Sequence, residues 1–313
     1  MSNKEYRPTL AQIRTFVTIA EHRHFGTAAN QLNISQPSLS QALVALESGL
    51  GIQLIERSTR KVIVTPVGER LLPYAQATLE AADSFVQHSR GAQGILTGQL
   101  TLGIIPTIAP YLLPELLRVT QERYPDLELK IVEETTPALM EQLRNGHLDS
   151  ALIAFPTGTT GLNEIPLYTE DFAIAVADNH IMAGRDDVTL SELDKLDMLL
   201  MDDGHCLRDQ IMDLCRNANL DVAGMTESVT RASSLTTIIQ LVAAGYGGTL
   251  LPVSAVPVEC SRPNVSVARF ADSVTASRNV GLVHRSSSTR SDEFAALGEL
   301  ITDAFHATVD KRV

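Results

Sequence analysis

From Gln99 to the C-terminus, short apolar runs alternate with helix-like segments, and this alternation limits the folds open to the chain. The apolar runs are QLTLGII, LELKIVEE, ALIA, FAIAVA, MLLM and VGLVH. Segments with helical spacing separate several of them, among them PYLLPELLRVTQERY and SLTTIIQLVAAGYG. Strands that alternate with helices predict an α/β fold with parallel sheets covered by helices. Ligand sites in such sheets lie where strands end, and Thr107 after LGIIP and Thr136 after LKIVEET have such positions.

Residues 9–47 have a different pattern, that of short helices joined by tight turns. Asn33-Ile34-Ser35 interrupts the pattern, with Ser35 as a predicted N-cap. The helix that follows is predicted to bury a stripe formed by Leu39, Ala42, Leu43 and Leu46. Its opposite face is small, polar and uncharged, and carries Pro37, Ser38, Gln41, Val44 and Ala45. Such a face suits the major groove of DNA, where Ser and Gln hydrogen-bond base edges.

Basic residues follow this helix in the segment IERSTRKVIV, for which we predict a short hairpin. Arg57, Arg60 and Lys61 would contact phosphates and set position rather than read sequence. Residues 1–65 contain seven Lys or Arg and four Asp or Glu, a balance of +3. Because the whole chain has a net charge of −12, the remainder carries −15. Only a cationic head of this kind would contact DNA. The alternative is a small helical bundle with solvated basic residues.

A long helix is predicted from Thr65-Pro66 to about Ser89. Its apolar positions recur at spacings of three and four, as in a heptad seam, at Leu72, Ala75, Leu79, Ala82 and Val86. Such a stripe could also pack into a core. We expect a dimerising helix over 66–90, because the DNA-binding head is too small to bind tightly alone. The segment 91–98, GAQGILTG, is then predicted to be a hinge.

The segment DDGHCLRDQIMDLCRNA contains Cys206 and Cys215. If residues 207–215 are helical, they rise about 13.5 Å and turn through about 180°, so the two cysteines lie on opposite faces. A disulfide needs Cα atoms within roughly 7 Å, so the two could bond only if the helix unwound. Oxidation would then rebuild this segment as a covalent switch.

Cys206 is the better nucleophile candidate, because it lies near a predicted helix start with His205 and Arg208 adjacent. Three nearby carboxylates oppose a thiolate, so the sequence leaves the sign of the pKa shift open. Cys215 is expected to be buried, and Cys260, in VECSRP, has no partner motif. Cysteines at this spacing are also common as ordinary core residues. Zinc needs four ligands, and no CxxC or HxxxH accompanies these cysteines, so no metal or other cofactor is expected.

The stretch FGTAANQLNISQPSLSQALVALESGLGIQLIERSTRKVIVTPVGERLL resembles the winged helix-turn-helix and linker helix of the LysR-type transcriptional regulators. The resemblance is continuous over about the first ninety residues, with Ile55 where many members have Phe. It implies that the second helix of the motif enters the major groove and that linker helices pair in dimers, commonly within homotetramers. The DNA-contacting residues of that helix would be Ser35, Gln36, Pro37, Ser38 and Gln41.

The resemblance to LysR-type regulators extends, more weakly in sequence, over the chain beyond the first ninety residues. There it implies a regulatory domain of two Rossmann-like subdomains, as in periplasmic binding proteins, with a small effector in the cleft between them. The implied domains are a winged helix-turn-helix over 1–65, a linker helix over 66–90, a hinge over 91–98 and a regulatory domain over 99–313. Subdomain I would comprise 99–167 and 275–313, and subdomain II would comprise 168–274.

A second resemblance is narrower. GHCLRDQIMDLC, with LGIIPTIAPYLLP and RNVGLVHR, closely resembles the hydrogen peroxide sensors of the LysR family. It implies that Cys206 is oxidised by peroxide to sulfenic acid and that Cys215 resolves it as an intramolecular disulfide. The peroxide-binding residues would be Thr107, Thr136, His205, Asp209 and Arg278. Hydroxyls and a guanidinium can hold both peroxide oxygens in line with the sulfur and stabilise charge on the leaving oxygen.

These resemblances imply double-stranded DNA, hydrogen peroxide and further copies of the chain as partners, with RNA polymerase as an additional one. The expected function is regulation of antioxidant genes rather than enzymatic turnover. No apolar run is long enough to cross a membrane and the N-terminus has no hydrophobic signal region, so a cytoplasmic, nucleoid-associated location is expected. Two alternatives stay open: an ordinary LysR-type regulator with a small carboxylate effector, for which Thr107 would serve equally, and a thiol peroxidase.

Overall fold

The computed structural model describes residues 6–57, 62–89, 96–156, 161–218 and 232–310. They form two compact units. The first comprises residues 1–93, 144–146 and 286–291, and the second comprises 94–143, 147–285 and 292–313. No helix among the described residues is long and apolar enough to cross a membrane.

The first unit begins with a helical head. Its elements are α1 (Leu10–His22), α2 (Phe25–Gln31), α3 (Gln36–Leu50), β1 (Ile55–Arg57), β2 (Val62–Val64) and α4 (Pro66–Ser89). Ser35 caps α3 by accepting a hydrogen bond from the backbone N–H of Ser38 at 3.2 Å, which confirms the predicted N-cap. Gly51 ends α3 in the left-handed region with φ of 69°, a conformation that glycine adopts without strain.

A small core joins α3 to the hairpin that follows it. Leu39 and Leu43 are fully buried in it, as predicted, together with Ile55 at the start of β1. The Glu47 carboxylate on α3 accepts hydrogen bonds from the backbone N–H groups of Leu54 and Ile55 at 2.8 and 3.0 Å. Strands β1 and β2 pair antiparallel, so the predicted short hairpin is confirmed. The hairpin therefore has a fixed position on the head.

Helix α4 occupies Pro66–Ser89, as the sequence predicted. Four of the five seam positions, Leu72, Ala75, Leu79 and Ala82, are half-buried, and Val86 is exposed. Tyr74 and Phe85 on the same helix are 69% and 75% exposed, so the helix presents apolar side chains to solvent. The predicted hinge lies largely outside the described residues, and Gly98 at its end already belongs to the next strand.

The second unit is an α/β fold. Its strands are β3 (Gly98–Ile104), β4 (Leu127–Glu133), β5 (Ser150–Phe155), β6 (Leu162–Ala177), β7 (Thr249–Pro252), β8 (Val265–Ala268) and β9 (Ser277–Arg285). Its helices are α5 (Ala109–Arg123), α6 (Thr136–Arg144), η1 (Leu190–Lys195), α7 (Cys206–Asn217), α9 (Leu235–Ala243), η2 (Val253–Ala255), α10 (Val256–Glu259) and α11 (Ser291–Asp310). The strand order is β4-β3-β5-β9-β6-β7, with β8 also paired to β6.

The expectation of parallel sheets is correct for only part of this order. Strand β3 is parallel to β4 and to β5, because helices α5 and α6 return the chain to the same edge. Strand β9 is antiparallel to both β5 and β6, and β6 is antiparallel to β7 and β8. The run MLLM does not form a strand: Met198 and Met201 make only isolated bridges.

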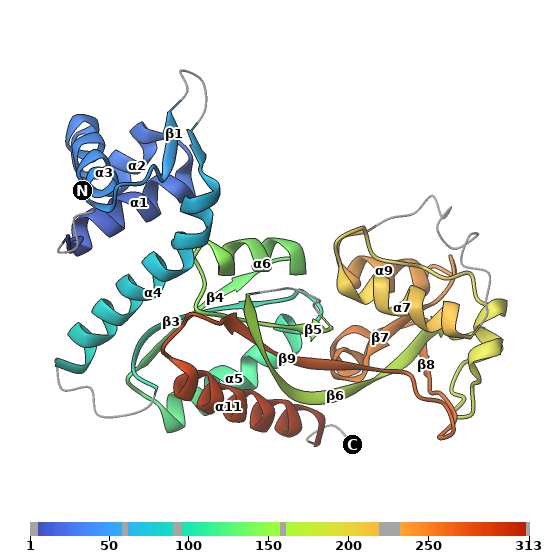
Figure 1. Cartoon of the computed structure of the whole chain (residues 1–313). Helices are drawn as coiled ribbons and strands as arrows, with labels where there is room; N and C mark the ends of the chain where they lie inside the picture. Colours follow the sequence, from blue (N-terminus) through green and yellow to red (C-terminus); the bar gives the residue numbers. More distant parts are fainter. Residues whose placement is uncertain (1–5, 58–61, 90–95, 157–160, 219–231, 311–313) are drawn as a thin grey trace. The chain divides into compact units, whose positions relative to one another are not determined.

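Strand β6 is long because it serves two hydrophobic cores. Its first part pairs with β9, and its last part, from Phe172, pairs with β7 and β8 (Figure 1). The first core contains residues of β3, β5, β9, α5, α6 and α11, and the second contains residues of β6, β7, α7 and α9. The predicted subdomain boundary at 167/168 falls inside β6. The chain therefore passes between the two cores without a loop at that point.

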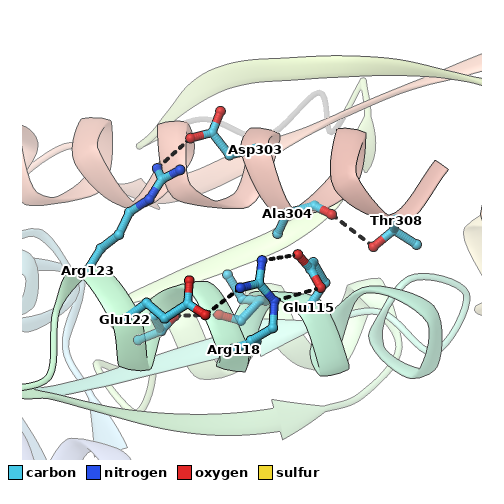
Figure 2. Close-up of polar contacts among 9 residues, drawn as sticks. Glu115, Arg118, Glu122, Arg123, Asp303, Ala304 and Thr308 are labelled. Carbon is cyan, nitrogen blue, oxygen red and sulfur yellow. Dashed lines mark hydrogen bonds and ion pairs between the residues drawn. The ribbon is translucent and has the colours of Figure 1, made fainter. Parts of the chain in front are cut away.

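The ion pairs on the outer surface of the first core have exposed side chains, except for the half-buried Glu115. Arg118 on α5 pairs with Glu115 and Glu122 of the same helix, and Arg123 pairs with Asp303 on α11 (Figure 2). Exposed pairs of this kind contribute roughly 0–1 kcal/mol each. The stability of this part of the fold therefore comes mainly from the buried apolar residues beneath these helices.

Candidate functional site

The first candidate surface is the outward face of α3. Its predicted DNA-contacting residues, Ser35, Gln36, Pro37, Ser38 and Gln41, are all exposed. Val44 on the same face is 47% exposed, whereas Leu39, Leu43 and Leu46 of the opposite stripe are buried. Arg57 is the last residue of β1, and Arg60 and Lys61 lie outside the described residues. The exposed face of α3 is therefore available to DNA, and the individual base and phosphate contacts stay predictions.

The second candidate site lies at the start of α7. Cys206 is the first residue of this helix and Cys215 is nine residues further along it, so the helix assumed from the sequence is present. Cys206 is partly buried and packs against the first core, whereas Cys215 is fully buried in the second core. Neither thiol is in a disulfide. A bond between them therefore requires α7 to unwind.

Arg278 from β9 is buried beside this thiol. Its side chain lies opposite Glu170 in the β6–β9 pairing, and its Nε and Nη2 donate to one oxygen, Oε2 of Glu170, at 2.9 and 2.6 Å. The side chains of Arg278 and Glu170 are 0% and 1% exposed. This ion pair is therefore fully buried and does not lie on the surface. A guanidinium in this position is held in one orientation.

Thr107 is placed by the turn between β3 and α5. Its hydroxyl oxygen accepts a hydrogen bond from Nη1 of Arg278 at 2.9 Å, and its carbonyl oxygen accepts one from Nη2 at 3.1 Å. The N-cap of α5 is Ile108, with no side-chain hydrogen bond to the helix, so Thr107 does not cap α5. Because its oxygen already accepts from arginine, the Thr107 hydroxyl proton is free to point at another molecule.

The remaining predicted residues surround the thiol in different ways. Thr136 begins α6, and its buried hydroxyl lies at the Cys206 thiol, whose thiolate it favours. His205 is the N-cap residue of α7 and is buried, whereas Asp209 in the first turn of α7 is exposed. The structure thus brings Thr107 and Arg278 into direct contact. It leaves Asp209 as the most solvent-accessible member of the set.

Several groups act on the pKa of Cys206. Burial raises it above the ordinary value of a thiol, and the Arg278 charge and the Thr136 hydroxyl oppose this shift, while Asp209 adds to it. The net direction, which the sequence left open, is upward. Burial also raises the pKa of Cys215 and lowers that of His205, against the opposing charge of Asp202. The thiolate of Cys206 is thus the less populated form at neutral pH, and Arg278 is the cation that favours it.

The third cysteine is not poised for reaction. Cys260 packs against the second core next to Glu259, and burial with this carboxylate raises its pKa to about 12. The described residues contain no group of three or more His, Cys, Asp or Glu that could hold a metal ion.

Sequence reasoning missed Glu170. This residue lies in the polar first part of β6, a stretch without a motif, and the sequence predicted only the apolar FAIAVA that follows it. The signal that identifies it is the register of β6 and β9, which places it opposite Arg278. That register is visible only in the folded chain.

Comparison with known families agrees with this architecture. Residues 10–69 match the model of the bacterial regulatory helix-turn-helix protein, lysR family, and residues 93–306 match the LysR substrate binding domain. The chain therefore belongs to the LysR family of helix-turn-helix regulators, which are not enzymes. The predicted fold class, a winged helix-turn-helix with a linker helix and an α/β regulatory domain, is confirmed.

Within that family, the chain is similar to members described as hydrogen peroxide-inducible activators or as OxyR. A Mycobacterium avium protein described as a probable hydrogen peroxide-inducible genes activator is 48% identical over 301 residues, 96% of each chain. A solved structure of Corynebacterium glutamicum OxyR, its C206S mutant with H2O2 bound, is 60% identical, with a TM-score of 0.71, 98% of this chain and 95% of that chain covered. The oxidised form of the same OxyR is 61% identical, with a TM-score of 0.63, 99% of this chain and 95% of that one covered.

Proposed function

We propose that this protein is a hydrogen peroxide sensor that regulates antioxidant genes through its DNA-binding head. The observation that carries the proposal is the contact of Arg278 with Thr107 beside the Cys206 thiol. It supplies a cation, a hydroxyl donor and a nucleophile in one buried place, which is what the reduction of a peroxide needs. The similarity to peroxide-inducible activators and to an H2O2-bound OxyR supports the same function.

In the first step the Cys206 thiolate attacks one oxygen of hydrogen peroxide. A sulfur–oxygen bond forms as the O–O bond breaks, so the sulfur is oxidised to sulfenic acid and the peroxide is reduced. The second oxygen leaves with the electron pair, takes a proton and departs as water. The free Thr107 hydroxyl and the Arg278 guanidinium would stabilise the charge that develops on this leaving oxygen. Thr136, His205 and Asp209 would complete the binding site.

In the second step the Cys215 thiolate attacks the sulfenic sulfur, forms the disulfide and releases the hydroxyl oxygen as water. Cys215 is fully buried in the second core at the other side of α7, so it must first leave that core. The oxidised segment cannot keep the helix described above. We propose that this rearrangement alters the paired DNA-binding heads of a dimer of dimers, and thereby contacts with RNA polymerase.

The buried network argues against an ordinary regulator with a carboxylate effector. A carboxylate would bind best to the paired donors of an arginine, and those of Arg278 already hold Glu170. An effector of that kind would have to displace a buried carboxylate of the protein itself. Hydrogen peroxide is uncharged and needs only single donors and acceptors. A thiol peroxidase is disfavoured because the family is one of DNA-binding regulators.

Titration of free thiols tests this function. We expect the wild-type protein to lose two thiols per chain at low peroxide, and to form an intramolecular disulfide seen by mass spectrometry of unreduced peptides. Cys206→Ser should keep both of its remaining thiols, because no sulfenic acid forms for Cys215 to attack. Cys260→Ser is the matched control and should still lose two. Retention of both thiols by the wild-type protein would refute the proposal.

A further inference from the structure

The Glu170 carboxylate has no role in the peroxide chemistry described above, although it is the main partner of Arg278. It is one of the few buried acidic side chains among the described residues, at 2% exposure. Its two oxygens have different partners: Oε2 accepts from Nε and Nη2 of Arg278, and Oε1 accepts from the backbone N–H of Ser254 at 3.1 Å. The carboxylate thus connects the arginine on β9 to η2, next to the second core.

A count of donors shows what this contact does to the arginine. A guanidinium has five N–H donors. In Arg278 the Nε donor and one Nη2 donor go to Glu170, and the other Nη2 donor and one Nη1 donor go to Thr107. Among the contacts of the described residues, one N–H remains, on Nη1. Rotation of the guanidinium would change which N–H is left over, and Glu170 prevents that rotation.

The ion pair between Glu170 and Arg278 also affects how strongly the Arg278 charge favours the Cys206 thiolate. Arg278 is the group whose positive charge most favours the thiolate of Cys206, and a buried carboxylate at 2.6 Å partly cancels that charge. Glu170 therefore weakens the thiolate while it fixes the guanidinium. A weaker thiolate slows any reaction of the Cys206 sulfur, whereas a fixed guanidinium assists only its reaction with peroxide. The two effects can therefore be separated by comparing peroxide with a reagent that needs the thiolate alone.

We propose that Glu170 is a positioning residue for the peroxide reaction: it holds Arg278 so that its single remaining Nη1 N–H, beside the Thr107 hydroxyl, meets the leaving oxygen. This inference rests on the proposed peroxide-sensing function. In this proposal Glu170 acts on the peroxide reaction through Arg278 and not by contact with the peroxide.

The test compares two reactions of Cys206 in full-length Glu170→Gln. Iodoacetamide alkylation needs a thiolate but no oriented guanidinium, whereas peroxide needs both. The neutral amide leaves the Arg278 charge uncompensated and puts an N–H2 group in competition with its donors. We expect alkylation at least as fast as in the wild type, and a rate constant with hydrogen peroxide that is lower by about 10- to 100-fold.

Glu259→Gln is the matched control. Glu259 is also a buried carboxylate, and it accepts from the hydroxyls of Tyr111 and Thr236 at 3.1 and 2.8 Å rather than from Arg278. It should lose stability but keep the wild-type rate with peroxide. If both glutamine variants slow equally, the effect is a general loosening of the fold and the proposal is overturned.

Glu170→Asp decides the question if Glu170→Gln does not fold. Aspartate keeps the charge and withdraws the carboxylate by one methylene, so alkylation should be unchanged while the peroxide rate falls. A wild-type peroxide rate in a folded Glu170 variant overturns the positioning role. A wild-type protein that itself fails to react with peroxide refutes the proposed function instead, so the two failures are distinct.

Discussion

At the scale of single residues, the Thr107 hydroxyl oxygen accepts one hydrogen bond from the described residues, and its proton remains available as a donor. Its oxygen accepts from Nη1 of Arg278, which turns the hydroxyl proton away from the guanidinium. Threonine and valine have nearly the same shape, so a valine here removes the polar atom and little else. The role of Thr107 can therefore be measured with little disturbance of packing.

We expect Thr107→Val to lower the rate constant of Cys206 oxidation by hydrogen peroxide by about 10- to 100-fold, because a donor to the developing oxyanion is lost. Stopped-flow measurement of thiol loss would give this rate. Thr120→Val is the control: Thr120 is also buried, and its hydroxyl donates only to the carbonyl of Leu116 in its own helix. An equal decrease in both variants would contradict a role for the Thr107 hydroxyl in the chemistry.

The sequence predicted which residue types gather at this site but not how they interact. Thr107 and Thr136 were identified from their positions after apolar runs, and Arg278 only from its resemblance to a motif. The cross-strand partner of Arg278 could not be foreseen, because Glu170 lies 108 residues away from it in a polar segment. Ion pairs between distant strands depend on register, and register emerges only when the sheet forms.

At the scale of elements, α7 is the part of the fold that the proposed Cys206–Cys215 disulfide would have to change. It contains both cysteines, and Leu207, Ile211 and Met212 are buried along it. Those contacts and the helical backbone stabilise the reduced state. Any substitution that weakens the helix without touching the buried side therefore favours the oxidised state.

Asp213 offers such a position, because it is exposed on α7 and, among the described residues, its ion-pair partner is the exposed Arg216. Asp213→Ala and Asp213→Gly remove the same ion pair but differ in helix propensity by about 1 kcal/mol. We expect the glycine variant to have a reduction potential about 20 mV more negative, as measured by equilibration with glutathione. The same exchange at Glu122 on α5 should leave the potential unchanged. Equal potentials for the two Asp213 variants would mean that α7 remains helical after oxidation.

The elements themselves were predictable to different degrees. The helices of the head, α4, α5 and α9 follow from clear periodicity, and α7 was assumed correctly. Strand β6 was predicted only in its apolar last part, since the first part alternates exposed and half-buried residues around Pro166. Conversely, the apolar run MLLM is buried without strand pairing, because burial alone does not require a ladder.

At the scale of the whole molecule, the head and the regulatory unit must be coupled for sensing to alter transcription. We expect reduced and oxidised wild-type protein to protect half-sites of different spacing on the DNA upstream of its own gene, as read by footprinting. Cys215→Ser treated with peroxide should keep the reduced footprint, because it cannot form the disulfide. Identical footprints for the two wild-type forms would contradict the switch.

The burial of Cys215 also limits the doses to which such a sensor can respond. A sulfenic acid at Cys206 has to wait until α7 releases its partner, and during that interval a second peroxide molecule can convert it to sulfinic acid. That product no longer reacts with a thiol. In the proposed mechanism, the depth at which Cys215 is packed would therefore set an upper limit on the useful peroxide concentration as well as a delay. Extreme stress would then inactivate the protein instead of activating it.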